Sequence, residues 1–258
     1  MSTDDPIDGG AAYDRWADYY DIGEGDRQPY LDFYASLLRA DTRSVLEIAC
    51  GTGVIASELR RRIADRGLEP RVAGVDLSMR MLDIARARDR SVDWVHADMR
   101  ELPIEGRFDL VFCCFNSFQF MLEDADLQAA FAAARDRTGP GGRFAFDLYQ
   151  PNLPYLAVAR QDSLARSLQH QGRALQIRED ARYDPDRRLL DLEWRLVEAE
   201  DASVELARTR FRIRQYLASD IERLLAATGW RILERFGDLQ RTPFNASSKK
   251  QVLVCAPA

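Results

Sequence analysis

The fold of this 258-residue chain is decided by Val45-Leu46-Glu47-Ile48-Ala49-Cys50-Gly51-Thr52-Gly53. The apolar residues of this segment are typical of a parallel strand that is covered on both faces. Gly51 and Gly53 permit backbone conformations and close approaches that a side chain would block. The helix expected over residues 54–64 directs its free amides and positive dipole end back at this turn. Such a corner binds a cofactor, and residues further along the chain decide which one.

Length and composition limit the class of protein. The length suits one large domain, or one domain with an insertion, and 46% hydrophobic and 30% charged residues are ordinary for a globular protein. The net charge of -6 argues weakly against a nucleic-acid partner. The acidic N-terminus lacks an apolar core of a secretory signal, and no apolar run is long enough for a membrane span. We therefore expect a cytoplasmic protein without a membrane partner.

The cysteines give no sign of a metal site. No Cys-x-x-Cys pair occurs, and the chain has only 2 histidines to complete a zinc set. Cys113 and Cys114 lie in an apolar run and are interpreted as small core residues. No metal is expected.

Strands and helices alternate after Val45. Strands are expected over residues 71–75, 92–95, 108–115 and 143–148, and helices over 79–88, with Ser78 as N-cap, and over 127–137, ended by Gly139-Pro140-Gly141-Gly142. This alternation indicates an α/β fold, a doubly wound, Rossmann-like and mostly parallel sheet. Residues 13–38 carry helical spacing, and the residues up to about Gly10 are expected to be disordered.

From about residue 174 the apolar residues recur at every second position. Leu190, Leu192, Trp194 and Leu196 alternate with charged residues, and Asp184-Pro185-Asp186 indicates a hairpin turn. We predict an antiparallel insertion of about three strands between 174 and 217, before the last helix. That helix should open with the capping box Ser219-Asp220-Ile221-Glu222, end at Gly229, and be followed by strands over 231–236 and 251–255. We expect three parts: lid helices and a cofactor-binding core (1–150), an antiparallel insertion that acts as substrate cap or dimer contact (151–217), and a last helix with two strands that complete the core sheet (218–258).

The glycine turn by itself allows more than one cofactor. A dinucleotide corner reads Gly-x-Gly-x-x-Gly, and here Ala56 stands at the third position. Glu47 lies in the strand where a nicotinamide fold usually keeps an apolar residue. Asp76 closes the next strand, where a carboxylate accepts ribose hydroxyls, and Asp98 closes the third, within reach of an adenine amine.

With these residues the chain resembles the class I S-adenosylmethionine-dependent methyltransferases. The resemblance rests on residues 46–53, on Gly74-Val75-Asp76-Leu77-Ser78, on Ala97-Asp98-Met99 and on Phe108-Asp109-Leu110-Val111, and ends with residues 127–142. It covers about residues 13–148 and the last two strands. Within this superfamily the chain is most similar to small-molecule N- or O-methyltransferases, including those of amino sugars.

The resemblance implies a seven-stranded sheet, S-adenosylmethionine as cofactor and a set of roles. Glu47 would orient the methionine part of the cofactor, Asp76 would bind the ribose, and Asp98 would read the adenine edge. Tyr13 and Tyr20 would belong to a lid helix over the cofactor and could bond the methionine carboxylate. The cofactor-binding residues implied are Tyr13, Tyr20, Glu47, Ala49, Gly51, Gly53, Asp76, Leu77, Met79, Asp98, Met99, Phe115 and Asn116.

The acceptor is less constrained. No Asn-Pro-Pro-Tyr tetrad follows the fourth strand; its place is taken by Phe115-Asn116-Ser117-Phe118-Gln119-Phe120, a mixture that suits a small, partly apolar acceptor. Some sugar N-methyltransferases carry a histidine where this chain has Phe120, and this departure argues against sugar N-methylation and against a histidine mechanism. The catalytic candidates are Asn116, Gln119 and Tyr20, and the substrate-binding candidates are Phe118, Gln119, Phe120, Tyr149 and Arg214. The alternatives are an RNA or protein methyltransferase, a non-catalytic sensor of the same fold and, third, a nicotinamide-dependent oxidoreductase.

The insertion carries Arg208, Arg210, Arg212 and Arg214 at alternating positions, which places them on one face. Asp191 and Glu193 on a neighbouring strand could pair with them and make a solvated, salt-bridged face. Arg214 could instead meet an anionic substrate or the cofactor carboxylate. A homodimer contact through the insertion is the third reading.

Overall fold

The computed structural model describes residues 9–23 and 26–258. A central sheet has seven strands in the order β10-β11-β5-β4-β1-β2-β3. β11 pairs antiparallel with both of its neighbours, and the pairings recorded among the other strands are parallel. These strands are β1 (Ser44–Ile48), β2 (Arg71–Asp76), β3 (Asp93–His96), β4 (Phe108–Cys113), β5 (Thr138–Tyr149), β10 (Trp230–Phe236) and β11 (Lys250–Pro257). The doubly wound α/β fold predicted from the sequence is confirmed.

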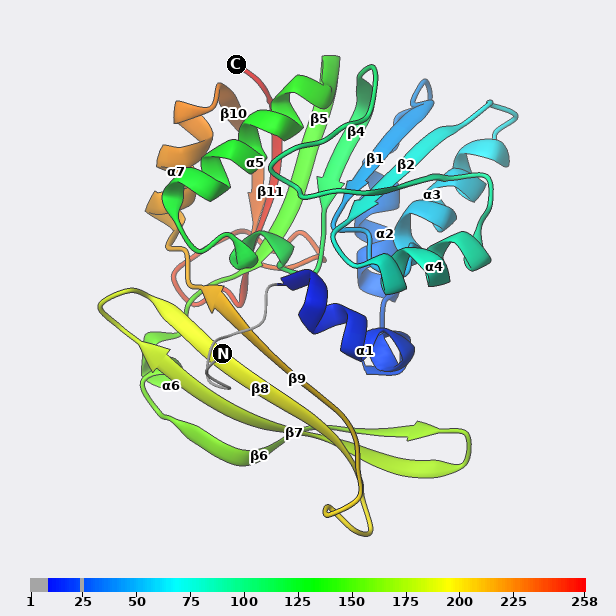
Figure 1. Ribbon diagram of the computed structural model, residues 1–258. Helices are drawn as coiled ribbons and strands as arrows, with labels where there is room; N and C mark the ends of the chain where they lie inside the picture. The colour runs from blue at the N-terminus through cyan, green and yellow to red at the C-terminus, as the bar shows by residue number, and fades with distance from the viewer. Residues whose placement is uncertain (1–8, 24–25) are drawn as a thin grey trace.

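Helices cover both faces of this sheet (Figure 1). One face packs against α5 (Asp124–Arg137) and α7 (Ala218–Ala227), and the other against α2 (Gln28–Ser36), α3 (Val54–Ala64) and α4 (Met79–Arg88). Strand residues alternate between the two cores, so that Val45 and Leu110 face α3 while Leu46 and Val111 face α5. Because both faces are covered, the strands are apolar almost throughout.

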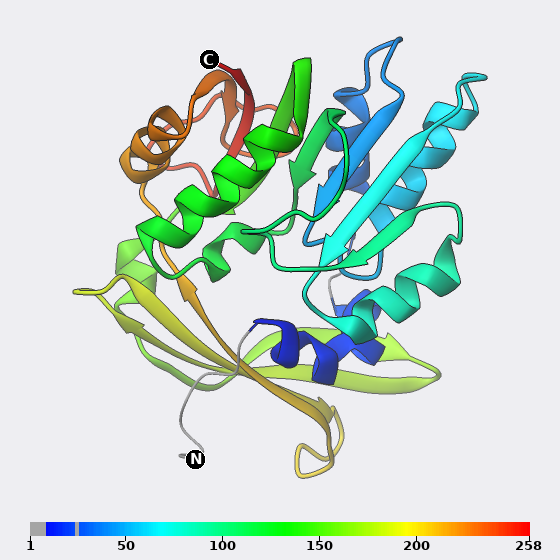
Figure 2. The ribbon, with the colours of Figure 1, turned by 45° about the horizontal axis from the view of Figure 1, so that its top comes forward.

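A second, antiparallel sheet lies beneath the carboxyl edge of the first. Its four strands follow the chain order: β6 (Arg160–His170), β7 (Arg173–Asp184), β8 (Leu189–Glu198) and β9 (Glu205–Arg214). Helix α1 (Gly9–Gly23) lies between this sheet and the core in both views (Figures 1 and 2). Ala12 and Trp16 of α1 are buried against apolar residues of the small sheet. A short helix, α6 (Leu153–Leu156), connects the two sheets.

Several predicted bounds are corrected by the structure. The insertion has four strands rather than three, since β6 precedes the expected region. The helical spacing over 13–38 corresponds to two helices, α1 and α2. Helix α5 begins at Asp124. Strand β5 begins at Thr138 and includes residues 139–142, which were expected only to end the preceding helix. The expected disorder of residues 1–8 lies outside the described residues.

The cap of α7 also differs from the prediction. The helix begins at Ala218, and Leu217 occupies the N-cap position. The Asp220 carboxylate accepts a hydrogen bond from the Leu217 amide at 2.9 Å. The pattern of Ser219 to Glu222 is therefore shifted by two residues, because Asp220 supplies the carboxylate that the prediction assigned to Glu222. By contrast, Ser78 caps α4 as predicted, with its hydroxyl accepting from the Met81 amide.

Candidate active site

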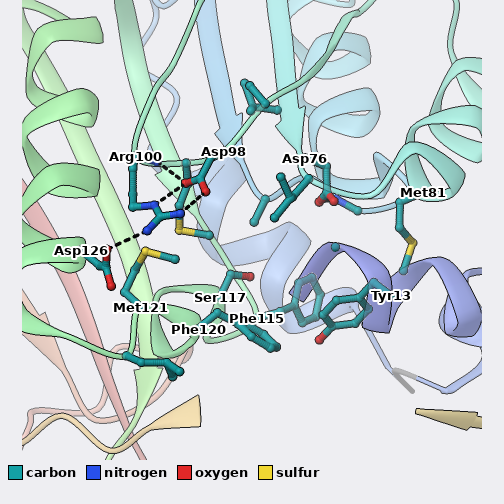
Figure 3. A pocket seen from close by; sticks show the side chains of 18 of the residues that line it. Tyr13, Asp76, Met81, Asp98, Arg100, Phe115, Ser117, Phe120, Met121 and Asp126 are labelled. Carbon is teal, nitrogen blue, oxygen red and sulfur yellow. Dashed lines mark hydrogen bonds and ion pairs between the residues drawn. The ribbon is translucent and has the colours of Figure 1, made fainter. Parts of the chain in front are cut away.

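A cavity of about 490 Å³ opens at the carboxyl edge of the parallel strands. Residues that follow β1, β2, β3 and β4 line its upper wall, and α1, the segment after β4 and β9 complete it. Figure 3 shows the side chains that converge there. The carboxyl edge is where open α/β sheets bind ligands, since the strand-end loops of several strands meet at it. This volume is in the range of small-molecule pockets, which run from roughly 300 to 1,000 Å³.

The turn after β1 is fixed by the carboxylate at the end of β2. Asp76 Oδ2 accepts from the Gly51 amide at 2.7 Å, and Oδ1 accepts from the Ser78 amide at 2.9 Å. Ala49 and Gly51 both have left-handed backbone angles, with φ of 55° and 52°. Burial raises the pKa of Asp76, although the backbone hydrogen bonds oppose this shift. A carboxylate has about four acceptor sites, more than the backbone donors of Gly51, Leu77 and Ser78 use.

Gly53 has a packing role rather than a place in the cavity wall. A Cβ on Gly53 would lie 2.4 Å from Trp94 Cη2, and a Cβ on Gly74 would lie 2.4 Å from Trp94 Cζ3. The indole of Trp94 therefore fills the space beside both glycines, on the α3 side of the sheet. Gly53 is absent from the cavity lining, so its expected place beside the cofactor is corrected.

Glu47 is likewise turned away from the cavity. Its side chain is 1% exposed, and Oε2 accepts from the Ala56 amide at 2.9 Å in the first turn of α3. The N-cap residue of α3, Gly53, has no side chain for this bond, so Glu47 supplies it from the neighbouring strand. Burial raises the pKa of Glu47 to about 8, while hydrogen bonds from Cys114 and Ala56 oppose the shift. The predicted contact with the methionine part of a cofactor is replaced by this structural one.

Asp98 lies at the end of the third strand as part of a carboxylate–guanidinium group. Arg100 Nη2 donates to Asp98 Oδ2 at 2.6 Å, and Arg100 Nη1 donates to Asp126 Oδ1 at 2.7 Å (Figure 3). Burial alone would raise the pKa of Asp98, but the hydrogen bonds from Arg100 outweigh it and lower the pKa. Asp98 is therefore a carboxylate acceptor at neutral pH, held in place at the cavity wall.

Helix α1 closes the cavity from below with aromatic rings. Tyr13 meets Tyr20 edge to face at 5.8 Å and Phe120 at 5.7 Å between ring centroids, and stacks on Phe211 of β9 at 6.5 Å. Polar contacts attach the helix to the core: Asp18 pairs with Arg80 at 2.8 Å, and Asp14 accepts from the Arg80 amide at 3.1 Å. The helix thus lies against the cavity, and its role as a lid stays a prediction.

Comparison with known proteins fits this geometry. Residues 45–142 match the protein family described as "Methyltransferase domain". The chain carries a class I S-adenosylmethionine-dependent methyltransferase domain. A solved structure, the CcbJ methyltransferase from Streptomyces caelestis, is similar over 98% of this chain and 100% of its own, with 26% identity and a TM-score of 0.80.

Two curated relatives match part of this chain. One is a dTDP-3-amino-3,6-dideoxy-alpha-D-glucopyranose N,N-dimethyltransferase of Streptomyces fradiae, 36% identical over 38% of this chain and 36% of its own length. The other is a cypemycin N-terminal methyltransferase of a Streptomyces species, 34% identical over 43% of this chain and 44% of its own length. The chain spans about half the length of the curated relatives it matches.

Most of the predicted site residues line the cavity of the methyltransferase domain. They come from α1, from the ends of the first four strands and from the segment after β4. The cavity-lining members of the predicted set are Tyr13, Tyr20, Ala49, Gly51, Asp76, Leu77, Asp98, Met99, Phe115 and Phe120. Their roles toward a ligand stay predictions.

The structure places other predicted residues outside the cavity lining. Met79 is 44% exposed on the first turn of α4, and Met81 lines the cavity instead. Phe118 is fully buried among Phe131, Phe144 and Phe146, so the acceptor contact predicted for it is corrected. The physical reason is that Phe118 lies in the 3-10 turn η1 (Ser117–Phe120), which directs it toward the sheet and Phe120 toward the lid.

Three polar candidates are engaged elsewhere. Gln119 is buried, and its Nε2 donates to the Arg214 carbonyl at 3.1 Å. Arg214 pairs with Asp124 at 2.9 Å and donates to the Leu122 carbonyl, so it fixes the start of α5, while Arg212 lines the cavity. Asn116 accepts from Lys250 Nζ at 2.9 Å. None of these three is among the lining residues.

The remaining predictions concern exposed groups. Tyr149 is 52% exposed at the end of β5, with Lys250 Nζ 4.6 Å from its ring centroid. The arginines of β9 pair with acidic side chains, as in the predicted salt-bridged face: Arg212 with Asp191, and Arg208 and Arg210 with Glu193.

No helix of the described part of the chain has the length and apolar character needed to cross a membrane.

Arg27 was missed by the sequence analysis. Its Nη1 donates to Asp21 at 2.9 Å, but Nε and Nη2 are buried and have no hydrogen-bond partner among the described residues. The guanidinium lies 5.1 Å from the ring centroid of Tyr20 and 5.9 Å from that of Phe115, two residues of the cavity wall. Buried N–H groups without a partner indicate a missing acceptor. Only the aromatic residues near it in the sequence could have drawn attention to it.

Proposed function

We propose that this protein transfers a methyl group from S-adenosylmethionine to the nitrogen of a small-molecule amine. The observation that carries the proposal is the cavity at the carboxyl edge, where Asp76 and Asp98 follow neighbouring strands and a lid helix covers the opening. Asp76 ends β2 and Asp98 follows the neighbouring strand β3, so we assign the ribose of a nucleoside to Asp76 and its adenine to Asp98.

The residues fit each part of the donor. The Asp76 carboxylate keeps acceptor capacity for a ribose hydroxyl beyond its backbone hydrogen bonds. Asp98 is ionised and can accept from the adenine amine. The donor's methionine carboxylate would supply the acceptor that Arg27 Nε and Nη2 lack, in a charge-assisted pair.

The donor supplies an activated methyl group on a sulfonium, and the protein supplies placement. The acceptor first loses its ammonium proton to solvent, the freed lone pair on nitrogen forms the new N–C bond, and the S–C bond breaks with its electrons going to sulfur. The α1 rings exclude water and hold the reactants in line, a contribution of several kcal/mol in well-oriented reactions. The buried Glu47 takes no part, because it faces α3.

The acceptor class is inferred from the charges of the wall. Carboxylates (Asp76, Asp98, Glu123 and Asp126) outnumber guanidiniums (Arg100 and Arg212), and both guanidiniums are ion-paired. Such a wall attracts an ammonium group and repels phosphate. The names of the two curated relatives describe nitrogen methylation, of a sugar amine and of an N-terminus. We therefore favour an amine without a phosphate group.

The test has two arms. Calorimetric titration with S-adenosylmethionine and with NAD first measures which cofactor binds. Metabolite extract is then incubated with the protein and methyl-labelled S-adenosylmethionine, and mass spectrometry identifies labelled products. Binding of S-adenosylmethionine together with a labelled amine supports the proposal. Binding without any labelled product favours the sensor, and a labelled oxygen or a labelled phosphorylated amine contradicts the acceptor class.

A peptide amine is a second candidate, because one relative is named as an N-terminal methyltransferase. Labelled peptides in the same mass spectrometry experiment would favour it. RNA methylation, the homodimer contact through β6 to β9 and the cytoplasmic location stay predictions from the sequence.

A further inference from the structure

The chain turns sharply after β4 through two residues in an unfavourable conformation. Phe115 and Asn116 both have left-handed backbone angles, with φ of 59° and 63°. Neither is a glycine, and such residues persist where the surrounding structure determines their conformation. Phe115 and Ser117 of this turn line the cavity. Whatever fixes the turn therefore fixes part of the cavity wall.

A buried ion pair makes hydrogen bonds to both residues of the turn. Asp147 on β5 accepts from the Phe115 amide at 3.1 Å. Lys250 on β11 donates to Asp147 Oδ2 at 2.7 Å and to Asn116 Oδ1 at 2.9 Å. The Asp147 side chain is fully buried and also accepts from the Tyr34 hydroxyl at 3.1 Å. One carboxylate and one ammonium thus hold both the backbone and the side chain of the turn.

The aromatic surroundings support the same arrangement. Tyr30 stacks on Phe115 with 4.0 Å between the ring centroids, and Lys250 Nζ lies 5.4 Å from the Tyr30 ring centroid. Lys250 is not among the residues that line the cavity, and its hydrogen bonds go to Asp147 and to Asn116 of the turn. A buried ion pair adds little net stability, because removing its charges from water costs free energy. We therefore assign this pair a role in fixing one conformation of the turn rather than in stabilising the fold.

We propose that Lys250 and Asp147 are positioning residues for methyl transfer, which hold Phe115 at the cavity wall by fixing the Phe115–Asn116 turn. This inference rests on the proposed function. The cavity wall that they support lies beside the glycine turn, where donor and acceptor would meet. A displacement of about 1 Å at a reacting centre can lower the rate on the order of 10²-fold.

Four variants and a control test the proposal. Lys250→Met removes both donated hydrogen bonds, and Lys250→Arg keeps donors for both oxygens. Asn116→Gly removes only the side-chain acceptor, and glycine accepts the left-handed angle without strain. Asn116→Ala removes the same acceptor without that freedom. The control is Lys249→Met, because Lys249 is the adjacent lysine and is exposed.

Three readouts separate positioning from folding. Turnover is measured with the amine identified by the labelled-extract experiment, donor affinity by calorimetric titration, and the Phe115 amide by hydrogen exchange. We expect Lys250→Met to lose on the order of 10² in turnover and to exchange the Phe115 amide faster than Lys249→Met does. Lys250→Arg should keep more turnover than Lys250→Met. Asn116→Gly should lose turnover at an unchanged melting temperature, and Asn116→Ala should lose turnover and also melt lower.

Contrary outcomes are equally defined. Wild-type turnover in Asn116→Gly, or equal turnover in Lys250→Met and Lys250→Arg, would overturn the positioning role. If Lys250→Met does not fold, Asn116→Gly decides, since it leaves the ion pair intact. A wild-type protein that methylates no amine refutes the proposed function itself, a result distinct from a loss confined to the variants.

Discussion

Replacement of Glu47 by glutamine should change how stability depends on pH. Glu47 is fully buried, and its pKa in the folded protein is about 8, against 4.5 for an exposed glutamate. An acid whose pKa is raised by folding binds its proton more tightly in the native state. Its contribution to stability is therefore complete below about pH 4.5 and declines as the pH rises toward 8.

The magnitude follows from the two pKa values. Between pH 6 and pH 8 the unfolded chain carries Glu47 ionised, while the native state passes from protonated to half ionised. Linkage over this interval lowers the free energy of unfolding by about 2 kcal/mol. Glutamine keeps an acceptor for the Ala56 amide but has no proton to lose. The difference in stability between Glu47→Gln and wild type should therefore move by about 2 kcal/mol in favour of the variant between these pH values.

Urea denaturation of both proteins at pH 6, 7 and 8 measures this difference. Other groups titrate in the same range, but they contribute equally to both proteins and cancel. A stability difference that stays constant from pH 6 to pH 8 would show that Glu47 is ionised in the native state, and would refute the assignment of a raised pKa.

Three further substitutions test the site and its frame. Arg27→Gln should weaken S-adenosylmethionine binding about 10- to 100-fold in calorimetric titration, because one or two charge-assisted hydrogen bonds are lost. The control Arg61→Gln, on the exposed face of α3, should bind normally. Equal affinities of the two variants would exclude the carboxylate contact. Tyr13→Phe should raise the S-adenosylmethionine dissociation constant more than it lowers the melting temperature, and an unchanged constant would count against a hydroxyl contact. Gly53→Ala should lower the free energy of unfolding by about 1–3 kcal/mol more than Gly67→Ala does. Both glycines have left-handed backbone angles, but only at Gly53 would the new Cβ meet Trp94. Equal losses of stability in urea denaturation would contradict the packing role of Gly53.

The sheet was predictable because its strands are apolar and separated by helices with the right period. The ends of β2 and β3 were predictable too, since Asp76 ends an apolar run and Asp98 follows the short strand that holds Trp94 and Val95. The strand β6 escaped prediction because it is mostly exposed and carries no strict alternation. The Asp147–Lys250 pair escaped because its two residues are 103 positions apart in the sequence. Arg27 escaped because its place beside Phe115 arises only when distant segments of the chain pack together.

The segment from Val45 to Gly53 determined, from sequence alone, that a strand, a glycine turn and a helix make the cofactor corner. Local periodicity and backbone freedom are enough for that conclusion. The tertiary structure decided what each residue of the segment contacts. Gly51 lies at the cavity and bonds to Asp76, whereas Gly53 makes room for Trp94 and Glu47 caps α3. The reason is that alternate strand residues face opposite sides of the sheet, and only the packed helices show which side holds the site.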